Sequence, residues 1–121
     1  MAEFHNLGQA GEEEAVKHLE GKGYKILMRN WKAGKHEIDI IAETNDFIVF
    51  AEVKTRSEDY LVNPSEAVTR EKQRSIIFAA DTYIKRYNID KESRFDIITV
   101  IKIGSYYQTE HIEDAFYPTL K

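Results

Sequence analysis

The chain has 121 residues, of which 42% are hydrophobic and 31% charged, and its formal net charge is −4. These values are typical of one globular domain, and the absence of cysteine excludes structural disulfides and thiolate metal sites. Every apolar run falls far short of the about 20 residues that a membrane-spanning helix needs. The N-terminal segment MAEFHNLGQAGEEE has no signal-peptide pattern, so we expect a cytoplasmic protein.

The basic residues are unevenly distributed. The negative net charge disfavours indiscriminate DNA binding, because affinity for DNA usually comes from neutralising phosphates. Lysine and arginine nevertheless gather within residues 17–36, at Lys54 and Arg56, and within residues 70–74. Three basic groups in one small chain leave a nucleic-acid-binding surface open, with solvated charged faces as the alternative.

The first half of the chain predicts a helix followed by three strands. The helix is expected over about residues 8–22, because the Gly21–Gly23 pair supplies a C-terminal cap. Turn residues then separate three strand-like segments, which cover residues 24–31, 36–43 and 47–55. The third segment is the most apolar, so we expect it at the centre of the sheet.

The second half predicts one long helix and two further strands. Asn63-Pro64-Ser65 is a helix start with proline in the first helical position, and the helix should run to about Tyr87, with a break near Thr69. A strand at residues 94–103 and a fifth at about 106–112 follow. The order helix, three-strand meander, helix, strand, strand predicts a single α/β domain with a mixed five-stranded sheet flanked by helices.

Glu12 is the candidate functional acid of the first helix. At about 100° per residue, Glu12 falls within the apolar stripe of Ala15, Val16 and Leu19, whereas the two glutamates that follow it turn towards solvent. A carboxylate on a buried stripe is costly unless it has a partner. We therefore expect a cation, a metal ion or a hydrogen-bond network beside Glu12.

Strand alternation places further acids and a lysine on shared faces. In residues 36–43, Ile38 shares a face with Ile40, and Asp39 lies on the other face. In residues 47–55, Glu52 and Lys54 share a face. If the faces of these antiparallel neighbours coincide, Asp39, Glu52 and Lys54 form one cluster that the first helix could join. The sequence leaves the register open, and a slip of one residue would turn Asp39 away.

Such a cluster has a chemical logic. Two or three carboxylates suit Mg²⁺ or Mn²⁺ with several retained waters, and such an ion can activate water for phosphoryl displacement. A lysine can orient that water or neutralise the transition state. The alternative is an ion pair between Glu52 and Lys54 on a solvated edge, which the apolar character of their strand disfavours.

The arrangement D-x12-E-V-K after a helical glutamate resembles the active site of the PD-(D/E)XK nuclease superfamily. The likeness extends to other blocks of the sequence, which are GEEEA, L-x3-G-Y, RNW, EIDIIA, F-x-E-V-K-T-R, EAVT-x2-KQR and RFDI. Together these resemble the YraN-like family of predicted bacterial endonucleases, which is similar in fold to archaeal Holliday-junction resolvases. The match runs from about Leu7 to Phe116.

The resemblance implies a restriction-endonuclease-like core and a role for each matched residue. Asp39 and Glu52 would be the principal ligands of Mg²⁺ or Mn²⁺, and Val53 would add its backbone carbonyl. Lys54 would be the catalytic lysine, and Glu12 the accessory helical acid.

The resemblance also points to Gln73, in the KQR block of the second helix. Gln73 shares a helical face with Ile77, Ala80 and Ile84, so it would reach the site from the N-terminal end of that helix. The alternative is a polar residue at the edge of the core.

The expected function is that of a metal-dependent endonuclease that hydrolyses DNA phosphodiester bonds, with branched or damaged DNA as its candidate substrate. By analogy of fold with resolvases, which cut two opposed strands, a homodimer is expected. The alternative is a non-catalytic nucleic-acid-binding or adaptor module on a nuclease fold, which the acidic composition leaves open.

Overall fold

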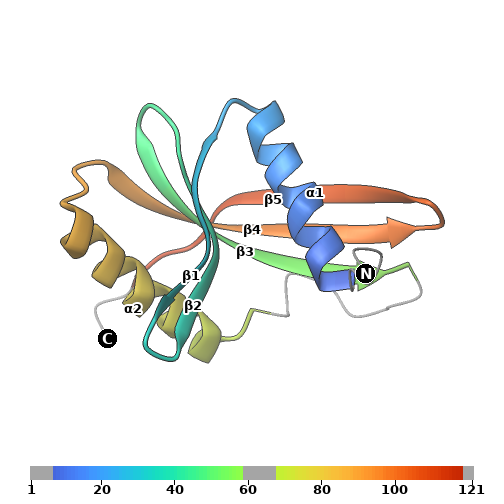
Figure 1. The fold of residues 1–121 in the computed structure, drawn as a ribbon. Helices are drawn as coiled ribbons and strands as arrows, with labels where there is room; N and C mark the ends of the chain where they lie inside the picture. The colour runs from blue at the N-terminus through green and yellow to red at the C-terminus, as the bar shows by residue number, and fades with distance from the viewer. Residues whose placement is uncertain (1–6, 59–67, 119–121) are drawn as a thin grey trace, which may run out of the picture.

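The fold contains the expected elements in the expected order (Figure 1). A computed structural model describes residues 7–58 and 68–118. Its elements are α1 (Leu7–Gly21), β1 (Lys25–Ala33), β2 (His36–Glu43), β3 (Phe47–Ser57), α2 (Arg70–Tyr87), β4 (Glu92–Ile103) and β5 (Tyr106–Phe116). β5 is longer than the sequence predicts, and the predicted helix start at Asn63-Pro64-Ser65 lies outside the described residues.

The five strands form one mixed sheet in the order β1-β2-β3-β4-β5. Neighbouring strands are antiparallel except for β3 and β4, which are parallel. A parallel pair requires a crossover connection, and α2 lies in that connection. The apolar strand β3 is central, as its composition predicts.

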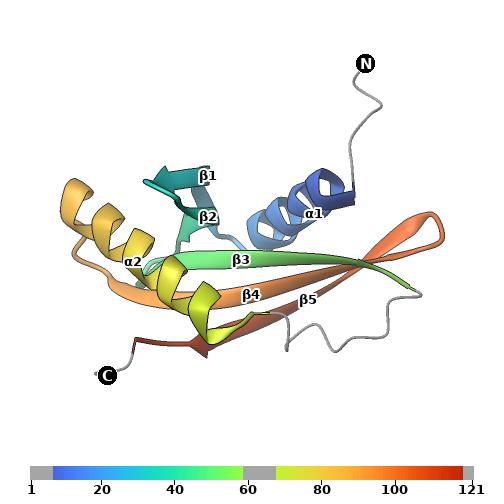
Figure 2. The same cartoon turned by 90° about the horizontal axis from the view of Figure 1, so that it is seen from below.

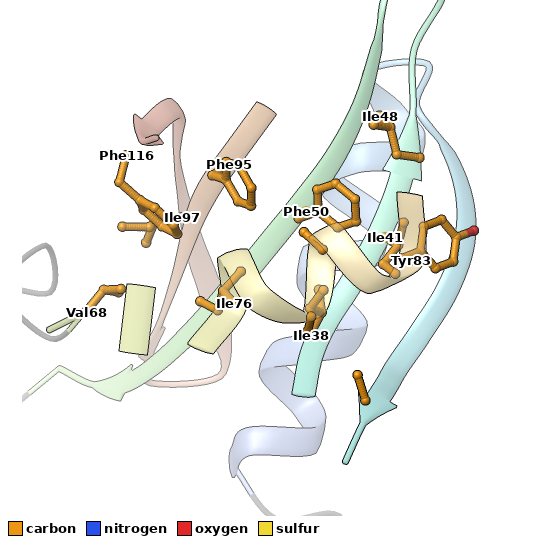
Figure 3. Close-up of a cluster of buried hydrophobic side chains, with 13 residues drawn as sticks. Ile38, Ile41, Ile48, Phe50, Val68, Ile76, Tyr83, Phe95, Ile97 and Phe116 are labelled. Carbon is orange, nitrogen blue, oxygen red and sulfur yellow. The ribbon is translucent and has the colours of Figure 1, made fainter. Parts of the chain in front are cut away.

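The two helices cover opposite faces of the sheet (Figures 1 and 2). On the α2 face, Phe50 at the centre of the core is fully buried and contacts the rings of Phe95 and Tyr83. Figure 3 shows Ile38 and Ile76 in the same cluster. The burial of these large apolar side chains is the main source of stability on this face.

On the α1 face, the helix approaches β3 very closely. Val49 and Ala51 of β3 pack against Ala15 and Leu19 of α1. One turn earlier, Gly11 is buried against Thr55, where an added Cβ would collide with Oγ1 and lie 2.7 Å from Cγ2 of the threonine. A residue without a side chain therefore allows the first turns of α1 to lie directly over the end of β3.

Helix α2 is closed at both ends by specific caps. The side chain of Thr69 accepts the backbone N–H of Lys72 at 3.1 Å, which satisfies one of the free donors of the first turn. At the other end Asn88 adopts a left-handed conformation with φ 52°. Neither helix in the described part of the chain is long and apolar enough to cross a membrane.

The RFDI block forms a buried ionic network between β4 and β5. Asp96 is fully buried and accepts hydrogen bonds from Arg94, from the ring of His111 and from the backbone N–H of Asp114. Burial alone would raise the pKa of Asp96, but the hydrogen bonds from His111 and Arg94 lower it below its usual value. Arg94 also donates a hydrogen bond to Tyr24, in the loop before β1. The RFDI block therefore connects β4 and β5 to the segment that precedes the first strand.

The close approach of α1 predicts the effect of a single methyl group. Gly11→Ala should lower the free energy of unfolding by roughly 1–2 kcal/mol, because overpacking against Thr55 outweighs the better helix propensity of alanine. Urea denaturation measures the change. Gly21→Ala in the same helix is the control, since a Cβ there meets nothing within 4 Å. Equal stability of the two variants would contradict the close contact.

Candidate active site

The site begins where β2 separates from β3. The described pairing between these strands runs from Glu43 opposite Ile48 to Ile40 opposite Ala51 and then stops. Figure 2 shows the β1–β2 hairpin turned away from the layer of β3, β4 and β5. One further step of the same register would place Asp39 opposite Glu52.

The separation of the strands also overturns one prediction about β2. Strict alternation places Ile38 and Ile40 on one face, but Ile38 packs with Ile41 on the α2 face and Ile40 packs on the α1 face. At this point β2 stays paired with β1, with Trp31 opposite Ile38, but it has lost β3 as its second neighbour, so its alternation is no longer fixed from both sides. The break therefore falls where β2 leaves β3, directly beside Asp39.

The side chain of Asp39 bridges the opening between the strands. Its Oδ2 accepts the backbone N–H of Val53 at 2.8 Å. A side-chain oxygen thus takes the place of the ladder carbonyl that the diverging strand no longer offers. This bond fixes the Asp39 carboxylate against β3, next to the residue that precedes Val53.

That preceding residue, Glu52, is a nearly buried carboxylate between two ammonium groups. Its side chain is 5% exposed, and its Oε2 lies 3.4 Å from Nζ of Lys54 and 3.8 Å from Nζ of Lys72 on α2. Its other oxygen, Oε1, is buried and has no hydrogen-bond partner among the described residues. An unsatisfied buried carboxylate oxygen is costly unless a cation or an ordered water binds it.

The two carboxylates disfavour each other's charge. Burial, followed by the adjacent negative charge of Glu52, raises the pKa of Asp39 to about 7. The N–H of Val53 and the ammonium of Lys72 act in the opposite direction but do not compensate. Near neutral pH the Asp39 carboxylate therefore readily takes up a proton.

Glu12 reaches the same place from α1. The buried stripe of this helix consists of Gly11, Ala15 and Leu19, so Glu12 lies at its border rather than in its middle. Its Oε1 accepts from the side-chain amide of Asn30 at 3.1 Å and lies 3.7 Å from the guanidinium of Arg29. Burial raises the pKa of Glu12 despite the Asn30 bond, and the charge of Asp39 adds to the rise.

One cavity of about 480 Å³ collects most of the predicted site. It is lined by residues of the first turns of α1, by Asp39 and by the end of β3. Of the six residues implied by the resemblance, five line this cavity, namely Glu12, Asp39, Glu52, Val53 and Lys54. The structure thus brings together residues that lie far apart in the chain.

Gln73 is the predicted residue that the structure places elsewhere. Its side-chain amide donates to the backbone carbonyl of Val68 at 3.2 Å, and the residue lines a second cavity between α2 and the end of β5. Its neighbour Lys72 is the α2 residue that approaches Glu52. The KQR block therefore does reach the site, but through the lysine.

The donor set of the cavity fits a hard divalent cation. Among the described residues, no group of three or more His, Cys, Asp or Glu side chains is arranged around a common point, which disfavours a closed zinc site. Mg²⁺ keeps several waters and is often held by only one or two carboxylates. The adjacent carboxylates of Asp39 and Glu52, which both line the cavity, meet that requirement, and the buried Oε1 of Glu52 has no hydrogen-bond partner among the described residues.

Sequence reasoning missed three residues that shape the site. The sequence does not single out Lys72, because it is adjacent to Gln73. Which of the two side chains points to Glu52 depends on the rotation of α2 about its own axis. Asn30 and Arg29, which bind Glu12, come from β1. Both residues belong to the RNW block, which is part of the family resemblance. Nothing in the sequence indicated that these two residues contact Glu12.

Comparison with known proteins places the chain in a family. The family described as "Uncharacterised protein family UPF0102" matches residues 11–100. The chain belongs to the UPF0102 family. This confirms the YraN-like resemblance at the level of the family.

UPF0102 relatives are similar to the chain over nearly their whole length. A UPF0102 protein of Bacteroides fragilis is 50% identical over 120 residues, with 99% of each chain covered. One of Phocaeicola vulgatus is 46% identical with the same coverage. One of Flavobacterium psychrophilum is 44% identical over 117 residues, covering 97% of this chain and 98% of the relative.

The raised pKa of Asp39 predicts how stability depends on pH in the metal-free protein. The folded-state pKa of Asp39, about 7, lies above the unfolded value near 3.9. Protonation of Asp39 therefore stabilises the folded state in full below about pH 4, and this contribution is lost as the pH rises through 7. The loss is progressive between about pH 4 and pH 7, at up to about 1.4 kcal/mol per pH unit for one such group.

Denaturation in EDTA at pH 5 and pH 8 measures this dependence. Asp39→Asn keeps an oxygen for the N–H of Val53 but carries no charge, so its free energy of unfolding should fall much less than that of the wild type. Asp81→Asn, at an exposed position of α2, is the control. An equal decline in wild type and Asp39→Asn would contradict the predicted titration.

Proposed function

We propose that this UPF0102 protein is a metal-dependent endonuclease that hydrolyses DNA phosphodiester bonds. The observation that carries the proposal is the pairing of the nearly buried carboxylate of Glu52 with the half-buried carboxylate of Asp39, with the ammonium of Lys54 at 3.4 Å from Oε2 of Glu52, in one cavity. The resemblance of D-x12-E-V-K to PD-(D/E)XK nucleases supports it, as does a mixed sheet with the acids on its central strands. On this proposal the fold is a restriction-endonuclease-like core.

The residues that the resemblance and the cavity share each have a role in this proposed reaction. Asp39 and Glu52 would hold Mg²⁺ or Mn²⁺, with the backbone of Val53 beside them. When bound, such an ion lowers the pKa of a water and stabilises charge on the phosphate. Lys54, only 19% exposed, is held at 3.4 Å from Glu52, where its charge can orient the attacking water and neutralise negative charge that develops on phosphate oxygens.

Glu12 has a different environment and therefore a different role. Its raised pKa and its position at the mouth formed by α1 make it a proton acceptor or a ligand for a water molecule rather than a principal metal ligand. The amide of Asn30 fixes one of its oxygens, so the carboxylate is oriented before any substrate arrives.

DNA cleavage tests the proposal directly. Linear, flapped and four-way DNA should be cut in the presence of Mg²⁺ or Mn²⁺, with the branched forms cut fastest, and cleavage should cease in EDTA. Glu52→Gln and Lys54→Ala should each lower the rate by roughly 10²-fold or more, because each removes charge that acts on the transition state.

Two exposed positions provide matched controls. Glu20→Gln on α1 and Lys102→Ala on β4 make the same chemical changes on the surface and should leave cleavage unchanged. Cleavage that persists in Glu52→Gln and Lys54→Ala would show that another site or a contaminant is responsible. A wild-type protein that cuts none of these DNAs would contradict the proposal.

A second candidate is a non-catalytic nucleic-acid-binding module on the same fold. The observation that favours it is the engagement of Glu12 with Asn30 and Arg29, which leaves two acids rather than three for a cation among the described residues. Calorimetric titration with Mn²⁺ separates the candidates. Binding at millimolar Mn²⁺ or below supports the nuclease, whereas DNA binding by a folded protein that takes up no Mn²⁺ supports the binding module.

A further inference from the structure

Lys72 is the basic residue whose position the proposed reaction leaves unexplained. It comes from the first turn of α2, on the opposite side of Glu52's strand from α1, and its Nζ lies 3.8 Å from the same Oε2 that Lys54 approaches to 3.4 Å. One carboxylate oxygen thus has two ammonium partners, while the second oxygen of Glu52 has none among the described residues. Lys54 alone can neutralise Glu52, and Lys72 in addition offsets part of the charge of the adjacent Asp39.

The placement of Lys72 is built into the helix. The backbone N–H of Lys72 donates to the capping side chain of Thr69, so its position relative to the start of α2 is fixed. A positive charge at a helix N-terminus is unfavourable, because it meets the positive end of the helix dipole. Lys72 also lies between Arg70 and Arg74, and Glu71 in the same first turn offsets only part of this positive charge. Helix stability therefore does not account for a lysine here.

The two lysines differ in their access to solvent. The side chain of Lys72 is 42% exposed, against 19% for Lys54. The more enclosed Lys54 can act only within the cavity. Lys72 can reach a group at the rim while its backbone stays in place, because its long side chain is flexible.

We propose that Lys72 is a phosphate-binding residue whose charge is held by Glu52 in the metal-free protein and becomes available to a DNA phosphate when Glu52 binds a divalent cation. This inference rests on the proposed nuclease function. It makes cation binding and DNA binding cooperative through one side chain. Because such coupling is reciprocal, DNA should also raise the affinity for the cation.

Three binding measurements test the role of Lys72 without relying on cleavage. In Lys72→Ala, calorimetry should show Mn²⁺ binding roughly threefold tighter or more without DNA, because a competing positive charge near Glu52 is gone. Fluorescence anisotropy with a short labelled duplex in Ca²⁺ should show a salt dependence smaller by about 0.9 in logarithmic slope, the value for one phosphate contact. The gain in DNA affinity on adding Ca²⁺ should shrink several-fold.

Two further variants separate charge from structure. Lys72→Arg should retain the salt slope and most of the Ca²⁺-dependent gain. Lys85→Ala, at the far end of α2 and paired with Asp81 at an exposed position, should behave as wild type in all three measurements. Thermal unfolding of each variant confirms that the fold is intact.

The outcomes distinguish this inference from the function on which it rests. Unchanged salt slope and Ca²⁺ gain in Lys72→Ala, weaker Mn²⁺ binding in that variant, or loss of the gain in Lys72→Arg would each overturn the role of Lys72. If the wild type cuts DNA but Lys72→Ala binds it normally, only this inference fails. If the wild type binds Mn²⁺ and DNA cooperatively through Lys72 but cuts nothing, the nuclease proposal fails and this one stands. If the wild type binds no DNA, both are overturned.

Discussion

The hydrogen bond from the backbone N–H of Val53 to Asp39 is the contact on which the site depends. Two antiparallel strands part at this point, and their separation creates both a gap in the sheet and unpaired backbone donors. An acidic side chain satisfies one such donor and is held beside Glu52 as a result. The same local feature therefore opens the cavity and brings two carboxylates together.

The surrounding donors and lysines compensate the charge of the two carboxylates only in part. Burial and the adjacent negative charge of Glu52 raise the pKa of Asp39 to about 7, and both nearby lysines approach the same oxygen of Glu52, Oε2. The remaining buried oxygen of Glu52 has no partner in the described part of the chain. The rest of the fold supports this arrangement. Gly11 allows α1 to lie close to β3, and the Thr69 cap holds the start of α2.

The sequence predicts the element order and the central strand well, because hydrophobic period, turn residues and caps are local signals. It also singles out Glu12, Asp39, Glu52 and Lys54, which the structure brings to one cavity, since charged residues inside apolar segments are conspicuous. It fails where the answer depends on non-local geometry. The break between Ile38 and Ile40 arises from strand separation, and the choice of Lys72 over Gln73 depends on the exact phase at which α2 meets the sheet. Neither is encoded in a residue pattern.

A crystal structure of the protein grown with Mn²⁺ tests the central claim most directly, because anomalous scattering locates the ion without reference to activity. We expect one peak in the cavity between the side chains of Asp39 and Glu52, with carboxylate oxygens at about 2.1 Å, the distance typical of small hard cations. We also expect this peak to disappear in Glu52→Gln. An empty cavity at saturating Mn²⁺, or an ion bound elsewhere while Glu52 still contacts both lysines, would contradict a metal site at these two carboxylates.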